Sequence, residues 1–248
     1  MTLYNPGQKV IELSLVELRN IVAWVAEHEG SLSTPTTILI GGWAVDAYNP
    51  YVGSVDIDLV TNSRTRGRLM NHLVHHEGFH YRRYTHHKTV EKGSGSETIT
   101  LDFYSRERPD PFEGGQGELA LDFLDDHTVI MPIRGGIRMA VPTRGALLAM
   151  KLKAVWDRSF RYELGRSSDP EWEYSKLVKD LADVLALLDP EHGGHDLDVE
   201  FLGEMLTRYA FLKRCIEILP ESGDARDKYE RMGERTVRRV CEDLLSVL

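Results

Sequence analysis

Two aspartates separated by one residue, Asp56 and Asp58, form the pattern with the clearest chemical potential in this sequence. They alternate with the apolar residues Val55, Ile57 and Leu59. Successive side chains of a strand point to opposite faces, so a strand here would bury the apolar residues and place both carboxylates on the other face. Neighbouring carboxylates repel each other and are usually stabilised by a hard cation or by basic partners. The pattern therefore favours a site for Mg²⁺ or Mn²⁺.

A third carboxylate, Asp102, lies in a second alternating stretch. Ile99, Leu101 and Phe103 would form the buried face there, so Asp102 would point to the opposite side. Three carboxylates on neighbouring strands can hold two Mg²⁺ ions and leave one carboxylate to accept a proton from an attacking hydroxyl. The three aspartates are therefore the candidate metal ligands and catalytic residues.

Two adjacent glycines precede these aspartates. Gly41 and Gly42 follow an apolar stretch, and 13 residues separate Gly42 from Asp56. Glycine lacks a Cβ, so its backbone N–H can approach phosphate oxygens closely, and the start of a helix favours anions. The glycines therefore predict binding of the triphosphate of an NTP substrate. An Asp-x-Asp pattern alone also occurs on charged edge strands, so the interpretation depends on the glycines and on Asp102 as well.

Helices and strands alternate in the first part of the chain. Ser14 and Glu17 match a capping box, which predicts a helix that starts at Ser14 and ends near Gly30. The periodicity also predicts two helices, at 43–48 and 64–76, and four strands, at 37–40, 54–60, 79–84 and 97–104. The glycine-rich stretch 113–117 lacks the Lys-Ser/Thr ending of a phosphate-binding P-loop and is expected to be a mobile hairpin or loop.

Helical periodicity takes over after Thr143. Helices are expected near 143–158, 171–189, 198–219 and 225–247. We place the boundary at Val141-Pro142, which gives domains 1–141 and 142–248. The expected fold class is α+β: a small mixed β-sheet core with flanking helices, followed by an all-helical C-terminal domain.

Two charged residues of the C-terminal helices are expected to face inward. On a helical wheel of ~100° per residue, Lys151 falls in the middle of an apolar stripe, while Lys153 falls on the opposite face. Asp180 lies at the edge of the stripe of its own helix, and Asp183 lies further toward solvent. An inward lysine needs an anionic partner, which is either Asp180 in a structural ion pair or the phosphate of a bound nucleotide.

The sequence resembles the nucleotidyltransferase superfamily that includes DNA polymerase β. The signature of that superfamily is a hydrophobic residue with Gly-Gly or Gly-Ser, a short spacer, and then Asp-x-Asp/Glu. Ile40-Gly41-Gly42 and Asp56-Ile57-Asp58 match it in order, with Asp102 as the third carboxylate, over roughly residues 37–104. The resemblance implies Mg²⁺-dependent transfer of a nucleotide from an NTP to an acceptor hydroxyl, with release of pyrophosphate.

Two subfamilies compete for the rest of the chain. Residues Gly42–Asp46 resemble the opening of small-molecule nucleotidyltransferases that modify aminoglycosides or lincosamides. Residues Leu147–Ala154 and Lys179–Val184 resemble the AbiEii toxin family, the nucleotidyltransferase partners of type IV toxin–antitoxin systems. That family also tends to carry a serine two residues before the first aspartate, a position that Ser54 occupies here.

The toxin-family resemblance implies an RNA acceptor, such as a tRNA 3′ end, and a cognate antitoxin protein. It also implies that Gly41, Gly42, Ser54 and Lys151 contact the NTP, and that Lys151 and Asp180 join the three aspartates in catalysis. The first alternative is an antibiotic nucleotidyltransferase with a small, acidic acceptor pocket. The second is a binding protein that retains the fold without catalysis, against which the three intact aspartates argue.

The charge distribution bears on the acceptor. Thirty basic and 39 acidic residues give a net charge of −9, which offers no general reason to expect nucleic-acid binding. The window from Thr61 to Lys92 is an exception, with two acidic residues and seven basic ones. The basic residues are Arg64, Arg66, Arg68, Arg82, Arg83, Lys88 and Lys92. We interpret this window either as a solvated surface or as a rim that attracts RNA phosphates.

Other features of the composition point to an ordinary globular protein. A chain of 248 residues, 42% of them hydrophobic, can bury a substantial core. No stretch approaches the ~20 apolar residues needed to span a bilayer, and the N-terminus has no leader pattern, so a cytoplasmic location without membrane contact is expected. Cys215 and Cys241 are expected to be reduced packing residues. Histidine pairs such as His72 and His76 lack the further ligands that a metal site needs.

Overall fold

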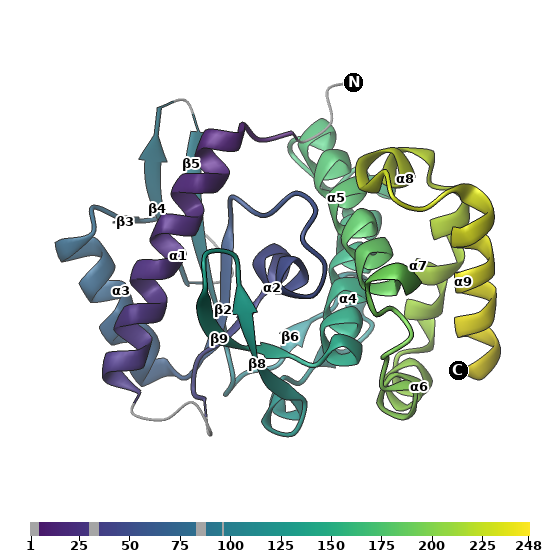
Figure 1. The fold of residues 1–248 in the computed structure, drawn as a ribbon, viewed down its shortest axis with the longest axis horizontal. Helices are drawn as coiled ribbons and strands as arrows, with labels where there is room; N and C mark the ends of the chain where they lie inside the picture. The colour runs from purple at the N-terminus through teal and green to yellow at the C-terminus, as the bar shows by residue number, and fades with distance from the viewer. Residues whose placement is uncertain (1–4, 30–34, 83–87, 96) are drawn as a thin grey trace. The chain divides into compact units, whose positions relative to one another are not determined.

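The computed structural model describes residues 5–29, 35–82, 88–95 and 97–248. They form two compact units. One unit contains Pro6–Asp110 and Leu119–Pro142, and the other contains Pro111–Glu118 and Thr143–Leu248. The expected α+β class, with a small mixed sheet and a helical C-terminal region, is confirmed (Figure 1). No helix in the described ranges combines the length and apolar character needed to cross a membrane.

The first unit is built around a five-stranded sheet. Its helices are α1 (Gln8–His28), α2 (Gly41–Tyr48) and α3 (Ser63–His76), with a 3₁₀ turn η2 (Asp122–Asp125). The strands of the sheet are β1 (Ile38–Ile40), β2 (Ile57–Thr61), β3 (His80–Tyr81), β4 (Lys88–Ser94) and β5 (Glu97–Ser105). Two further pairs are β6 (Asp110–Pro111) with β7 (Glu118–Leu119) and β8 (Thr128–Ile133) with β9 (Ile137–Pro142).

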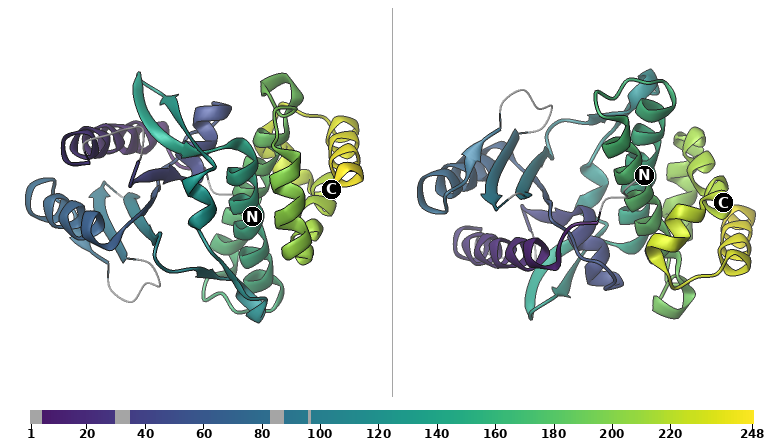
Figure 2. Two further views of the ribbon diagram at one scale, coloured as in Figure 1. Left: turned by 90° about the horizontal axis from the view of Figure 1, so that it is seen from below. Right: turned by 90° about the horizontal axis from the view of Figure 1, so that it is seen from above.

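The strand order of the main sheet is β1-β2-β5-β4-β3. Only the β2–β5 pair is parallel, and the other pairs are antiparallel. Helices α1 and α3 lie beside each other along the sheet (Figures 1 and 2), where Trp24 of α1 meets His72 of α3 with ring centroids 6.1 Å apart. This face of the sheet is apolar, and Leu59 and Leu101 are fully buried on it. The opposite face is therefore the one that carries the polar side chains of β2 and β5.

Helix α1 begins earlier than the capping box predicts. It starts at Gln8 after Gly7, so Ser14 and Glu17 lie inside the helix and the predicted start at Ser14 is wrong. Both side chains are buried and make tertiary contacts instead. The Ser14 hydroxyl accepts a hydrogen bond from Trp43 Nε1 at 3.0 Å, and Lys92 Nζ donates to Glu17 at 2.6 Å. The capping-box motif and these tertiary contacts both use a serine hydroxyl and a glutamate carboxylate three residues later, so the sequence pattern alone does not distinguish them.

Several strands differ from their expected bounds. Strand β2 begins at Ile57 rather than 54, because its partner β1 pairs only with Asp58–Val60 and its partner β5 only from Leu101 onward. The expected strand 79–84 is reduced to β3, and Tyr84 lies outside the described residues. Strand β4 was not expected, since charged residues obscure the alternation in Lys88–Ser94. The hairpin β8–β9 was not expected either.

The second unit is helical. It contains α4 (Arg144–Glu163), α5 (Pro170–Leu188), α6 (Val199–Arg208), α7 (Lys213–Glu217), α8 (Gly223–Tyr229) and α9 (Glu234–Val247). Short 3₁₀ turns are η1 (Glu113–Gly115), η3 (Pro190–His192), η4 (Ala210–Leu212) and η5 (Leu219–Glu221). Helices α4 and α5 lie side by side. Cys215 and Cys241 are free and buried, and burial raises the pKa of each thiol to about 12.

Two long helices expected in this unit are interrupted. The helix expected at 198–219 ends as α6 and continues as η4 and α7, because the backbone at Tyr209 is not helical. The helix expected at 225–247 is divided into α8 and α9 by Glu230, whose φ of 66° lies in the left-handed region. Both interruptions are local backbone changes that leave the apolar periodicity intact, so periodicity alone could not locate them.

The glycine-rich stretch 113–117 was expected to be a mobile hairpin or loop, but it is packed against a helix. It contains η1, which packs on α4. Trp156 Nε1 donates to the carbonyl of Glu113 at 3.1 Å, and the Glu113 N–H donates to Asp157 at 2.9 Å. Gly114 has a φ of 82°, and a Cβ there would lie 2.6 Å from the Phe160 ring. Glycine is required because the backbone lies directly against an aromatic side chain.

The buried role of Ser14 can be tested by substitution. Ser14→Ala should lower the free energy of unfolding by about 1–3 kcal/mol, because it leaves the Trp43 indole N–H buried without its acceptor. Ser14→Asp should cost more, since it places a carboxylate at a fully buried position. At a true helix N-cap, aspartate would perform as well as serine. Denaturant unfolding of both variants separates the two roles, and an unchanged Ser14→Asp protein would restore the capping interpretation.

Candidate active site

Asp58 and Asp102 occupy adjacent positions on the two parallel strands. In the register of β2 and β5, Asp58 is the partner of Asp102 and Ile57 is the partner of Leu101. The apolar residues of this register are fully buried, whereas both aspartates are partly exposed. Strands in a sheet lie about 4.7–4.9 Å apart, so the two carboxylates are neighbours on the polar face. The predicted placement of these two side chains on one face is confirmed by the register.

Asp56 and Ser54 lie just before β2. Burial alternates through this segment: Val55 and Ile57 are buried, while Ser54 and Asp56 are partly exposed. The alternation expected for a strand is therefore present, although regular pairing begins only at Ile57. Asp56 thus shares the partial exposure of Asp58, although it lies in a bend before the regular strand.

Gly41 lies directly against the Asp58 carboxylate. It is the first residue of α2 and has a φ of +68°. A Cβ at this position would lie 2.0 Å from Asp58 Oδ2, which no side chain can tolerate. Gly42, the next residue, is buried. Gly41 therefore lets the start of α2 contact the carboxylate of Asp58, whose register partner on the neighbouring strand is Asp102.

Helix α2 is anchored on both sides of the Gly-Gly pair. The indole of Trp43 is fully buried and bonded to Ser14, as described above. Asp46 is 1% exposed, and its Oδ1 lies 2.8 Å from Arg134 Nη2, at the turn between β8 and β9. Sequence reasoning missed Arg134, because nothing in its local pattern points to a residue about 90 positions earlier in the chain. These contacts fix the helix whose first residue touches Asp58.

Thr89 of β4 is a second residue that sequence reasoning missed. It is the register partner of Asp102 across the β4–β5 pair, and its hydroxyl donates a short hydrogen bond to Asp102 Oδ1. The Thr89 side chain is 3% exposed. A signal was present in the alternation of Thr89 and Glu91 with Val90, but the strand itself was not expected. The hydroxyl fixes one oxygen of the third carboxylate.

The donor set of this face suits a hard cation. Among the described residues, no group of three His, Cys, Asp or Glu side chains forms a ready-made metal cage. Mg²⁺ does not need one, since it is usually bound by one or two carboxylates together with substrate phosphates and water. Asp58 and Asp102, in adjacent register positions, provide carboxylate oxygens of that kind. Asp56 is the carboxylate nearest to Asp58 in sequence.

Lys151 and Asp180 are brought together in the helical unit. Lys151 Nζ lies 2.9 Å from Asp180 Oδ1 and 2.7 Å from Asp183 Oδ2, and Lys151 is 7% exposed. Burial opposes the charged form of Lys151, but the carboxylates of Asp180 and Asp183 outweigh it and raise its pKa. Burial likewise opposes ionisation of Asp180, yet Lys151 and Arg158 hold its pKa well below the usual range. The inward orientation of Lys151 and Asp180 is confirmed.

The helical wheel predicted that Lys153 and Asp183 face solvent, and both predictions are wrong. Lys153 is not on a solvent face: it is 7% exposed, and its Nζ lies 2.6 Å from Asp157 and 3.0 Å from the carbonyl of Pro111. Asp183 is fully buried rather than turned toward solvent. A wheel assumes one covered side, whereas α4 contacts α5 on one side and η1, α6 and α7 on others.

The buried charges extend from Lys151 across α4 and α5. Arg158 Nε lies 2.7 Å from Asp180 Oδ2, and Arg158 and Arg161 both reach Glu173, at 3.0 and 2.9 Å. Lys179 pairs with Asp183. Every carboxylate of this cluster meets at least one cation, which is the condition under which buried charges are tolerated. The helix pair is therefore joined by ion pairs as well as by apolar packing.

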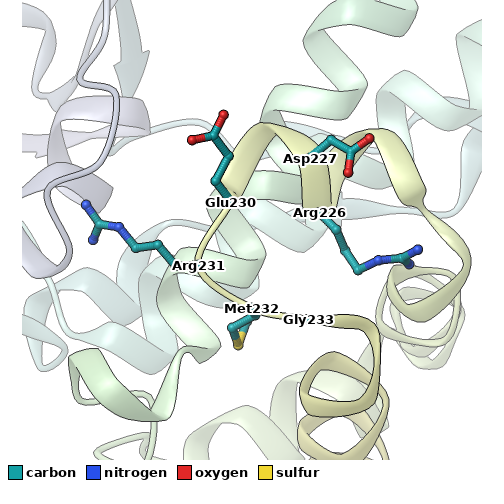
Figure 3. A pocket seen from close by; sticks show the side chains of 6 residues that line it. All are labelled: Arg226, Asp227, Glu230, Arg231, Met232 and Gly233. Carbon is teal, nitrogen blue, oxygen red and sulfur yellow. The ribbon is translucent and has the colours of Figure 1, made fainter.

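A hollow of about 520 Å³ lies elsewhere in the helical unit. It is lined by Arg226, Asp227, Glu230, Arg231, Met232 and Gly233. The guanidinium groups of Arg226 and Arg231 point away from each other (Figure 3), and Arg226 donates to the carbonyl of Pro220. The hollow thus lacks converging cations for an anionic ligand, and we assign it no role in the site.

The basic window is divided by the structure. Arg64, Arg66 and Arg68 lie on α3, which packs beside α1 on the apolar face of the sheet, opposite the face of the aspartates. Arg82 follows β3 and is exposed. Arg83, His86 and His87 lie outside the described residues. His72 lies 3.4 Å from Glu77 and its ring is 5.3 Å from that of His76.

The amino-acid sequence matches a known protein family. The family described as "Nucleotidyl transferase AbiEii toxin, Type IV TA system" matches residues 30–238. Two solved structures of the antibiotic-resistance factor ANT(2″)-Ia are similar, one in solution and one a crystal structure with adenylyl-2″-tobramycin. Each has a TM-score of 0.45, with 17% and 16% identity. The matches cover 82% and 81% of this chain and 96% and 98% of the other.

A search of curated proteins finds no match. The family match spans most of the chain and includes the Gly-Gly pair, the three aspartates, Lys151 and Asp180. This chain therefore belongs to the AbiEii family of nucleotidyltransferase toxins of type IV toxin–antitoxin systems, and it is a nucleotidyltransferase.

Proposed function

We propose that this nucleotidyltransferase uses Mg²⁺ to transfer a nucleotide from an NTP to the terminal hydroxyl of an RNA, such as a tRNA 3′ end, as the toxin of a toxin–antitoxin pair. The observation that carries the proposal is the pairing of Asp58 with Asp102 on parallel strands, with Gly41 at the start of α2 against Asp58. Carboxylates beside a glycine that opens a helix supply metal ligands and phosphate-binding N–H groups in one place.

The proposed reaction assigns a task to each part of this face. Mg²⁺, when bound, supplies charge neutralisation of the triphosphate and orientation for in-line displacement. Asp56 and Asp58 hold the ion together with Asp102, and the backbone of Gly41 and Gly42 binds phosphate oxygens. Mn²⁺ is an equivalent oxygen-seeking ion. Ser54 is proposed to contact the triphosphate from the segment before β2.

The covalent step is a displacement at the α-phosphorus. The acceptor hydroxyl gives its proton to Asp102 while its oxygen forms a bond to the α-phosphorus. The bond from that phosphorus to the oxygen bridging to the β-phosphate breaks, and pyrophosphate leaves with the electron pair. Lys151 is proposed to offset phosphate charge, oriented by Asp180. Each of these groups stabilises charge that develops during the transfer.

The proposed acceptor is RNA because of charge. The window 61–92 is basic within a chain of net charge −9. Within that window, Arg82 follows β3 and is exposed, whereas Arg64, Arg66 and Arg68 lie on α3. An exposed arginine beside this sheet attracts RNA phosphates, whereas it repels aminoglycosides, which are polycations. An antibiotic nucleotidyltransferase is the rival, and a cognate antitoxin is the expected protein partner of a type IV toxin. The family assignment as a nucleotidyltransferase argues against the remaining alternative, a non-catalytic binding protein, and a measurement of transfer tests this directly.

The first test removes a metal ligand. Asp58→Asn should abolish transfer from labelled NTPs to total RNA while the protein remains folded, because the change removes charge at a partly exposed position. Asp126→Asn, at an exposed position of the same unit, is the matched control and should be fully active. Parallel reactions with aminoglycosides decide the acceptor class. Full activity of folded Asp58→Asn would remove the assignment of the site.

A second test concerns Thr89. Thr89→Val removes the hydroxyl that holds Asp102 and should lower kcat about tenfold, the effect of losing roughly 1.4 kcal/mol of interaction. The KM for NTP should change little, because Thr89 is buried behind the carboxylate. Thr89→Ser keeps a hydroxyl and should recover most of kcat. Steady-state kinetics on the two variants test this. An equal loss of kcat in both would show that the hydrogen bond from Thr89 to Asp102 does not contribute to catalysis.

The third test separates catalysis from folding at Lys151. Lys151→Ala removes one of the cations that pair with Asp180 and Asp183, and Lys153→Ala removes the ammonium beside Asp157, so each should lower the free energy of unfolding by up to about 3–5 kcal/mol. Only Lys151→Ala should also lower the turnover of folded protein, by more than tenfold if it loses about 1.5–3 kcal/mol of phosphate contact. Melting curves and kcat below the melting range give both quantities. Equal turnover in the two variants would make Lys151 purely structural.

A further inference from the structure

A single row of residues crosses the polar face of the sheet from Asp58 to its far edge. Asp58 on β2 is the partner of Asp102 on β5, and Asp102 is the partner of Thr89 on β4. The Arg82 N–H donates to the carbonyl of Thr89 at 3.1 Å, which continues the register to the residue after β3. Residues that are register partners lie on the same face of a sheet, so Arg82 and the two aspartates share this face.

The neighbouring row ends in a second basic residue. His80 on β3 is the partner of Glu91 on β4, and Glu91 is the partner of Thr100 on β5. The Glu91 carboxylate lies 3.1 Å from His80 Nε2 and 3.6 Å from Arg82 Nε. Glu91 is 23% exposed, while the side chains of His80 and Arg82 are 63% and 53% exposed. One carboxylate therefore orients two basic side chains that remain open to solvent.

The row has the dimensions and composition of a path for an extended polymer. Three interstrand steps of about 4.7–4.9 Å separate Arg82 from Asp58, which is roughly 14 Å. The side chains between the ends of the row are those of Asp102 and the small, buried Thr89. A nucleic-acid acceptor has its phosphates on one side of the reacting 3′ hydroxyl only. A chain that places this hydroxyl at Asp102 can extend its phosphates along the row toward Arg82.

We propose that the 3′ end of a single-stranded RNA acceptor lies along this row, with its terminal hydroxyl at Asp102 and an upstream phosphate bound by Arg82 and His80. This inference rests on the proposed function, in which Asp102 receives the proton of the acceptor. Arginine suits the task because its planar guanidinium binds phosphate oxygens in pairs. Glu91 is then a positioning residue that keeps Arg82 on the polar face in the absence of RNA.

Acceptor length provides the decisive experiment. Single-stranded RNA oligonucleotides of one, two, four and eight nucleotides with free 3′ hydroxyls are compared as acceptors for wild type, Arg82→Gln and Arg82→Lys. Arg138→Gln, an exposed arginine on β9 of the same unit, is the matched control. We expect Arg82→Gln to raise KM several-fold for the longer acceptors and to leave the KM for NTP, kcat and the shortest acceptor unchanged. Arg82→Lys should be intermediate.

Binding provides a readout that does not depend on turnover. Anisotropy of a labelled eight-nucleotide RNA, titrated over salt concentration, should give a slope of log K against log salt that is shallower in Arg82→Gln by about 0.7, the value for one phosphate of a single strand. Wild-type slope in Arg82→Gln, or an equal loss at all acceptor lengths, would overturn the path. Binding that depends on Arg82, without transfer to any RNA, would support the path and reject the proposed acceptor chemistry.

Discussion

The close approach of Gly41 to Asp58 is the constraint on which the polar face of the sheet depends. A Cβ on Gly41, the first residue of α2, would clash with the Asp58 carboxylate. Its φ of +68° is also one that residues other than glycine rarely adopt. This contact fixes where α2 begins relative to β2. Trp43 and Asp46 then hold the rest of the helix through Ser14 and Arg134. A short helix of eight residues is positioned by tertiary contacts rather than by its own propensity.

The helical unit follows a different physical principle. Its central helices are joined by paired charges in a region with almost no solvent, where an unpaired charge would be far more costly than a pair. Lys151 sits between Asp180 and Asp183, and Arg158 links Asp180 to Glu173. Such ion pairs add directional contacts between α4 and α5 to the non-directional apolar contacts of that interface. Lys151 therefore has a structural role in this helix pair through its contacts with Asp180 and Asp183.

The sequence was informative where local periodicity determines the outcome. The alternation around Asp58 and Asp102 predicted which side chains share a face, and the wheel predicted that Lys151 and Asp180 turn inward. Both depend on one element at a time. Ser14, Thr89, Arg134 and Lys153 were misread or missed because their roles are set by partners on other elements. The burial of Ser14, Thr89 and Lys153 depends on how many sides of an element are covered, and the contact of Arg134 depends on a distant helix, neither of which one element's pattern contains.

The single parallel strand pair has a consequence for the order of folding. Asp102 follows Asp58 by 44 residues, and β5 reaches β2 only after α3, β3 and β4 have intervened. The hairpin of β4 and β5 is local and can close quickly, whereas docking of β5 beside β2 must overcome the entropy of a long loop. The two carboxylates therefore meet late in folding. During synthesis, a chain that has not yet released β5 from the ribosome cannot pair Asp58 with Asp102, so this face forms only once the core of the unit is assembled.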